Sequence, residues 1–129
     1  MSLDALRGTL PAYARDLSLN LSSLATLRQQ QGRAAEAGRL FARALPLQER
    51  LYGRGHPEVA MTVHNLAFHE RSLGNLARAE TLYSRALRAF RRALGPRHPH
   101  TRLCASNLRA VAGERDRARR LKAGRPTGR

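Results

Sequence analysis

Residues 56–99 read HPEVAMTVHNLAFHERSLGNLARAETLYSRALRAFRRALGPRHP, and they hold one copy of a unit that the chain repeats. Aligned at an offset of 42 residues, residues 17–58 and 59–100 are identical at 13 of 42 positions. The identities include the His-Pro pair near the end of each copy and two glycines. An internal repeat of this length indicates one supersecondary unit that stacks on copies of itself.

The apolar residues predict two helices in each unit, because they recur at intervals of three and four residues. In the second unit one series runs from Val59 to Leu73 and another from Leu76 to Leu94, with Gly74 between them. A glycine in this position is typical of a left-handed helix C-cap. The proline of each His-Pro pair suits the first turn of the next helix. No segment shows the alternation of a strand, so an all-α protein is predicted.

The repeats define the domain organisation. We expect a helical repeat domain over residues 1–112, with full repeats at about 17–58 and 59–100 and a partial repeat at 101–112. The partial repeat is predicted to be a terminal helix that covers the last pair. Residues 113–129 are basic and poor in apolar side chains, and they are expected to form a flexible tail. Residues 1–10 align with the end of a second helix, and Pro46 is expected to kink or interrupt its helix.

At these positions the sequence resembles a tetratricopeptide repeat protein, and the 42-residue period resembles the kinesin light chain variety. The second unit carries the matching signature at Leu66, Ala67, Gly74, Ala79, Tyr83 and Ala86. The resemblance implies a right-handed α-solenoid of antiparallel helix pairs, with two full repeats and a terminal helix. It also implies a non-catalytic scaffold, without cofactors, whose first helices line a concave groove for a peptide or protein partner.

The resemblance also places residues in that groove. An asparagine before the signature leucine clamps the peptide backbone in such repeats, since an amide both donates and accepts hydrogen bonds. Phe68 is a candidate apolar anchor. The alternative is that the asparagines bridge neighbouring helices and that Phe68 packs. The expected groove residues are Asn65, Asn107, His64, Phe68, Arg71, Ser23, Thr26 and Ser106.

The charge of the chain suggests a second function. Lys and Arg number 24 against 9 acids, a net charge of +15, which favours an acidic partner or a nucleic acid. Base-composition bias is the competing explanation. Trp is absent, and the pattern predicts that Tyr83 and Phe90 are buried, so stacking platforms for bases are missing. The expected polyanion strip comprises Arg78, Arg85, Arg88, Arg92, Arg115, Arg119 and Arg120.

Other chemistry has little support in the sequence. The acids show no paired arrangement for acid–base catalysis, and Cys104 has no nucleophile context. His56 and His98 belong to the repeat connection and are expected to be structural, so no metal site is predicted. A single cysteine and the lack of an apolar span favour a cytoplasmic protein that does not bind membranes. Self-association through exposed repeat ends is a further hypothesis.

Overall fold

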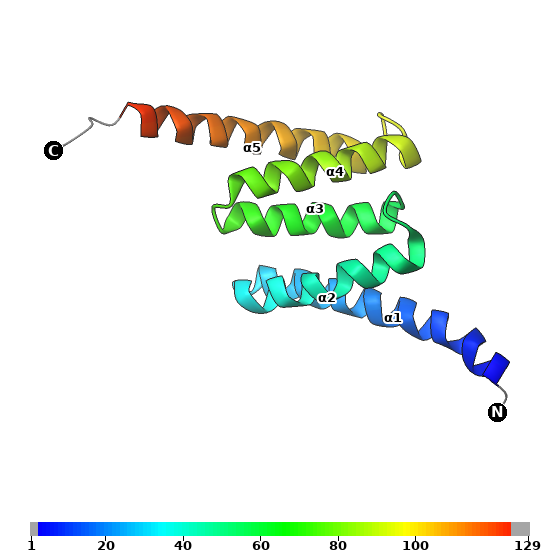
Figure 1. The fold of residues 1–129 in the computed structure, drawn as a ribbon. Coiled ribbons are helices and arrows are strands. Elements are labelled where there is room, and N and C mark those ends of the chain that lie inside the picture. The colour runs from blue at the N-terminus through cyan, green and yellow to red at the C-terminus, as the bar shows by residue number, and fades with distance from the viewer. Residues whose placement is uncertain (1–2, 125–129) are drawn as a thin grey trace.

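The helices of the structure follow the apolar spacing of the repeat (Figure 1). The computed structural model describes residues 3–124, with side chains from residue 12 onward. Over that range the secondary structure is entirely helical, as predicted: α1 (Leu3–Gln30), α2 (Ala34–Tyr52), α3 (Pro57–Ser72), α4 (Leu76–Leu94) and α5 (Pro99–Ala123). Successive helices turn back on one another and pack in chain order, so α1 and α2 form one pair, α3 and α4 the next, and α5 lies on α4 (Figure 1).

The turns explain the glycines and the His-Pro pairs. Gly74, between α3 and α4, has φ +83°, and no atom lies within 4 Å of the position where a Cβ would stand. Glycine is therefore required for its backbone angle and not for space. In the connections that lead into α3 and α5, the Nδ1 atoms of His56 and His98 accept hydrogen bonds from the backbone N–H groups of Glu58 and His100, at 3.0 and 3.1 Å. Both histidines are structural N-caps, as the sequence predicted.

The core is built from small and aromatic side chains of paired helices. Ala79 and Ala86 of α4 are fully buried, which lets α3 and α5 pack closely against α4 around Tyr83 and Phe90. Cys104 of α5 is buried in the same cluster, and burial raises the pKa of its thiol to about 11. The predicted burial of Tyr83 and Phe90 is thus confirmed, and neither ring is exposed to stack on a base.

Three local expectations differ from the structure. Helix α1 runs unbroken from Leu3 to Gln30, so residues 3–10 are not the end of a separate second helix, and residues 1–2 lie outside the described range. Helix α2 is not interrupted at Pro46, and a kink there stays a prediction. Helix α5 extends to Ala123, past the expected end of the domain at residue 112. Along this extension Glu114 and Arg115 make ion pairs with α3 and α4. The flexibility of the tail stays a prediction, and residues 125–129 of it are not described.

The outer face of α5 differs from the matching face of α3. At the positions of the buried Ala60 and Ala67 in α3, α5 carries Arg102 and Arg109, and both arginines are exposed. Terminal units of a repeat stack need a polar outer face of this kind. The residues of α5 therefore fit the predicted role of a covering helix.

Candidate partner-binding groove

A cavity of about 170 Å³ lies between the first helices of the two repeats, α1 and α3. Three of the expected groove residues meet there: Ser23 and Thr26 from α1, and Asn65 from α3. Their meeting follows from the repeat, because they occupy the same face of consecutive first helices. The complete lining consists of Leu19, Ser22, Ser23, Thr26, Glu58, Met61, Thr62 and Asn65.

Two hydroxyl groups of α1 at this cavity donate hydrogen bonds to carbonyl oxygens of the same helix. Ser22 Oγ donates to the Leu19 carbonyl oxygen at 3.2 Å, and Thr26 Oγ1 donates to the Ser22 carbonyl oxygen at 3.1 Å. Their hydrogen atoms are therefore used within α1, and their oxygen atoms can only accept from a ligand. Asn65 is half-buried at the cavity and supplies its one side-chain amide.

Arg71, another expected groove residue, is engaged inside the protein. Its guanidinium donates to both carboxylate oxygens of Glu114 in α5, with Nε at 3.1 and 3.2 Å from them. These hydrogen bonds lower the pKa of Glu114. One repeat earlier, Gln29 Nε2 donates to Ser72 Oγ at 2.9 Å. Because Gln29 and Ser72 align with Arg71 and Glu114, this is one contact that recurs between successive first helices.

His64 and Asn107 form a second bridge between α3 and α5. Asn107 Nδ2 lies 3.0 Å from His64 Nε2. His64 is only 9% exposed, its ring stands edge-on to Tyr83 at 5.3 Å, and burial lowers its pKa. A neutral imidazole accepts the hydrogen bond from the Asn107 amide. This pair is the helix-bridging arrangement that was the alternative to a peptide clamp.

The last two groove candidates differ in position. Phe68 follows Asn65 by one helical turn on α3 and is 50% exposed, so its ring is not packed in the core. Ser106 lies apart from the α1–α3 cavity. It lines a separate hollow between α4 and α5, together with Arg91 and Arg109.

The predicted polyanion strip is partly neutralised. Arg78 pairs with Glu70 at 3.1 Å, Arg85 with Glu49 at 3.4 Å, and Arg115 with Glu80 at 3.0 Å. In the part of the chain that the structure describes, no ion pair involves the remaining four members. These are Arg88, Arg92, Arg119 and Arg120, and all four are exposed.

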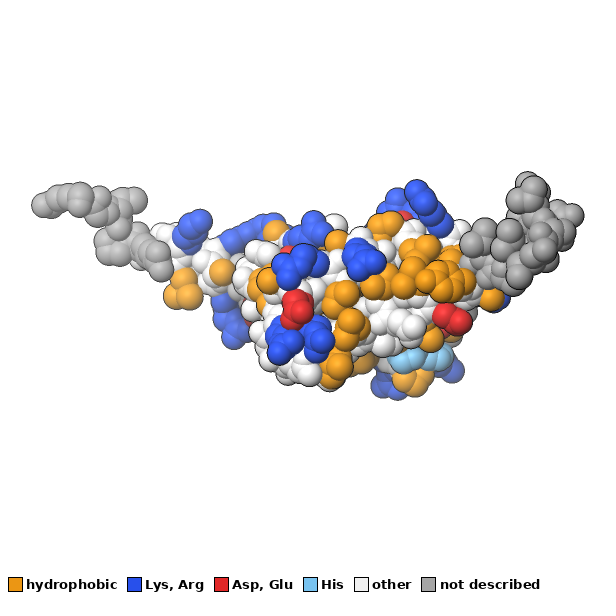
Figure 2. All heavy atoms as spheres, turned by 90° about the horizontal axis from the view of Figure 1, so that it is seen from below, with side chains coloured by type: hydrophobic (Ala, Val, Ile, Leu, Met, Phe, Trp, Pro, Cys, Tyr) orange, Lys and Arg blue, Asp and Glu red, His pale blue; other side chains and the backbone are white. Residues whose placement is uncertain are grey.

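Some of these arginines gather at one end of the stack. Arg78, Arg115 and Arg119 line a shallow hollow between the start of α4 and the end of α5, and Lys122 joins them there. On the face seen from below, hydrophobic side chains gather toward the end where α1 begins, and Lys and Arg are most numerous toward the opposite end (Figure 2). Sequence spacing indicated the basic residues but not this meeting of two helices.

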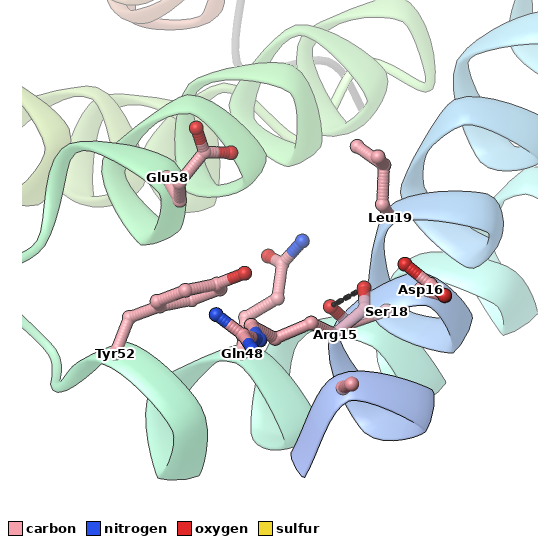
Figure 3. Close-up of a pocket in the computed structure, with 8 residues that line it drawn as sticks. Arg15, Asp16, Ser18, Leu19, Gln48, Tyr52 and Glu58 are labelled. Atoms are coloured by element: carbon pink, nitrogen blue, oxygen red, sulfur yellow. Dashed lines mark hydrogen bonds between the residues drawn. The ribbon is translucent and has the colours of Figure 1, made fainter. Parts of the chain in front are cut away.

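A second cavity, of about 330 Å³, was not anticipated. It lies where α1, α2 and the start of α3 meet, and the Gln48 amide projects from α2 into the space between Glu58 and Leu19 (Figure 3). Leu19 and Glu58 also line the α1–α3 cavity, so the two cavities adjoin. The signal in the sequence was the alignment of Gln48 with the apolar Phe90.

Comparison with known proteins agrees with this architecture. A family model described as Tetratricopeptide repeat matches residues 16–67 and 58–120, which together cover most of the chain. No curated protein matches at a significant level. None of the helices in residues 3–124 combines the length and the apolar character needed to cross a membrane. Tetratricopeptide repeats are non-catalytic modules that generally mediate protein–protein interactions. By the extent of the match and the stacked helix pairs, the chain belongs to the tetratricopeptide repeat family.

Proposed function

We propose that this protein is a non-catalytic scaffold that binds an extended peptide or protein segment along the face shared by α1 and α3. The observation that carries the proposal is the meeting of Ser23, Thr26 and Asn65 at one cavity, with a half-exposed Phe68 one turn further along α3. An amide can hold a peptide backbone, and an exposed aromatic ring can anchor an apolar side chain. The period of 42 residues supports the kinesin light chain variety, and the single cysteine supports a cytoplasmic location.

In this proposal the expected groove residues that bond to other helices hold α3 in place and do not contact the partner. Arg71 with Glu114, and His64 with Asn107, tie α3 to α5 and fix the orientation of α3. Their replacement is expected to act through stability and groove shape and not through direct contact with the partner.

A second candidate function rests on the basic end of the stack. Arg78, Arg115, Arg119 and Lys122 surround one hollow, which is suited to a phosphate backbone or to an acidic protein segment. Arg78 and Arg115 each share their charge with a glutamate, which weakens this candidate relative to the groove.

Affinity capture from a lysate of the host organism separates the two functions. The bait is the full chain, washed at about 0.3 M salt with nuclease present to suppress phosphate-driven binding. We expect a discrete protein to be captured by the wild type and by Arg88→Ala, an exposed change on α4. Asn65→Ala and Phe68→Ala are expected to lose it while their circular dichroism stays helical.

The opposite pattern would overturn the groove proposal. If the captured material disappears with salt or nuclease, or is lost in Arg119→Ala and retained in Asn65→Ala, the basic hollow is the binding site.

A further inference from the structure

The cavity at the α1–α2–α3 junction exists because the first repeat departs from the second. In the second repeat Phe90 is buried and its ring stacks on His100, with centroids 5.9 Å apart. At the same two positions the first repeat has Gln48 and Glu58. A packed aromatic pair is thus replaced by an amide and a carboxylate around a cavity of about 330 Å³.

Gln48 carries a hydrogen-bond acceptor that the protein does not use. Its side chain is only 3% exposed, and its Nε2 lies 3.4 Å from Ser22 Oγ. Since Ser22 donates its own hydrogen to the Leu19 carbonyl, it can only accept from Gln48, which fixes the orientation of the amide. The Oε1 atom of Gln48 then has no donor among the residues described. A buried acceptor without a donor destabilises a fold, and this oxygen is free to accept a hydrogen bond from a bound donor.

Two exposed carboxylates also line the cavity. Asp16 and Glu58 line it, and across residues 12–124 no ion pair includes either carboxylate, although the chain carries 24 basic residues. The Tyr52 hydroxyl is directed toward the Gln48 amide (Figure 3), and its ring is held by stacking on His56 at 4.9 Å. Arg15 also lines the cavity, and its side chain is exposed, so its guanidinium opposes a bound cation there.

We propose that this cavity binds the ammonium group of a lysine side chain. An ammonium ion carries three donors on one compact atom. The buried Gln48 Oε1 and the Tyr52 hydroxyl can accept from it in the cavity, and the exposed Glu58 carboxylate at the rim supplies the opposite charge. The lysine comes from the partner, and this part of the inference rests on the proposed function. Because Leu19 and Glu58 belong to both cavities, a segment lying between α1 and α3 would place one side chain here. The site gives an overall basic protein a local preference for a basic residue.

The test uses n-butylammonium, which has the chain length and charge of a lysine side chain, with n-butanol and butyrate as matched controls at constant ionic strength. The readout is the side-chain amide signal of Gln48 in ¹⁵N-labelled full-length protein. We expect a saturable shift with n-butylammonium and none with the two controls. In Gln48→Phe, which lacks this amide signal, binding is followed by the backbone amide signals of α1 and α2, and we expect no binding of n-butylammonium. Glu58→Gln should weaken it at least fivefold.

Arg15→Ala decides the sign of the site. A cation site should bind n-butylammonium more tightly once the neighbouring guanidinium is removed, and an anion site should show the reverse. Absence of any n-butylammonium shift, an equal response to n-butanol, or a stronger response to butyrate would overturn the proposal. Asn65→Ala separates this inference from the groove: it should leave n-butylammonium binding unchanged even where it abolishes capture of the partner.

Discussion

Replacing Gln48 with phenylalanine is expected to stabilise the protein. The change removes an amide oxygen that lacks a donor, which recovers about 1–3 kcal/mol, and it gives up one weak hydrogen bond to Ser22, worth about 1 kcal/mol. Burial of the phenylalanine ring adds about 1.5–3 kcal/mol. The cavity of about 330 Å³ beside Gln48 leaves room for the ring, and Phe90 already fills the equivalent place in the second repeat.

The net gain is about 1.5–5 kcal/mol, which for a chain of this size raises Tm by roughly 5–20 °C. Thermal and urea unfolding, followed by circular dichroism, measure it. The matched control is Phe90→Gln, which imposes the first-repeat residue on the second repeat and should cost at least about 3 kcal/mol. An unchanged or lower Tm for Gln48→Phe would show that the amide of Gln48 already has its hydrogen-bond partners within the folded protein and is not held for a ligand.

The remaining predictions concern the features that hold the stack. Glu114→Gln should cost about 1 kcal/mol at pH 7. Because the pKa of Glu114 is lowered in the folded state, its contribution to stability is present above the unfolded value near 4.5 and is lost as the pH falls below it. Urea unfolding at pH 7 and 3 should therefore show a smaller difference between wild type and variant at pH 3, and an equal difference at both pH values would contradict this prediction. His56→Ala should lose about 1 kcal/mol with the cap on Glu58 N–H, and His56→Asn should restore most of it in the same assay; equal losses would argue against capping. Gly74→Ala should destabilise the protein by about 1 kcal/mol because of the positive φ at this position, whereas Gly113→Ala, inside α5, should stabilise it by up to about 1 kcal/mol. Changes in Tm of the same sign for the two variants would contradict these roles of the glycines.

Local signals in the sequence were sufficient for the architecture. Helical spacing, the turn glycines and the His-Pro pairs each act within a few residues, so they predict helix pairs, caps and the burial of Tyr83 without knowledge of distant contacts. Helix α5 exceeds its predicted length, and two residues of the extension, Glu114 and Arg115, have partners on other helices that no local pattern indicates. Composition alone marks the same residues as a solvated tail.

The site could be predicted only in part for the same reason. Repeat alignment brings Ser23 and Asn65 to one face, and the structure has them at one cavity. The alignment does not show which polar side chains form hydrogen bonds with the neighbouring repeat. For this reason Arg71 and Asn107, which bond to other helices, were expected in the groove. The Gln48 cavity depends on three helices meeting, which no local pattern records.

Site-specific photo-crosslinking can show whether the partner lies on the face shared by α1 and α3. A benzophenone amino acid is placed at position 68 on α3, and at position 88 on α4 as the control; both native residues are exposed. We expect the captured partner to crosslink from position 68, at about 0.3 M salt and with nuclease present, and not from position 88. Crosslinking from position 88 alone, or crosslinks at position 68 that vanish under these conditions, would contradict it.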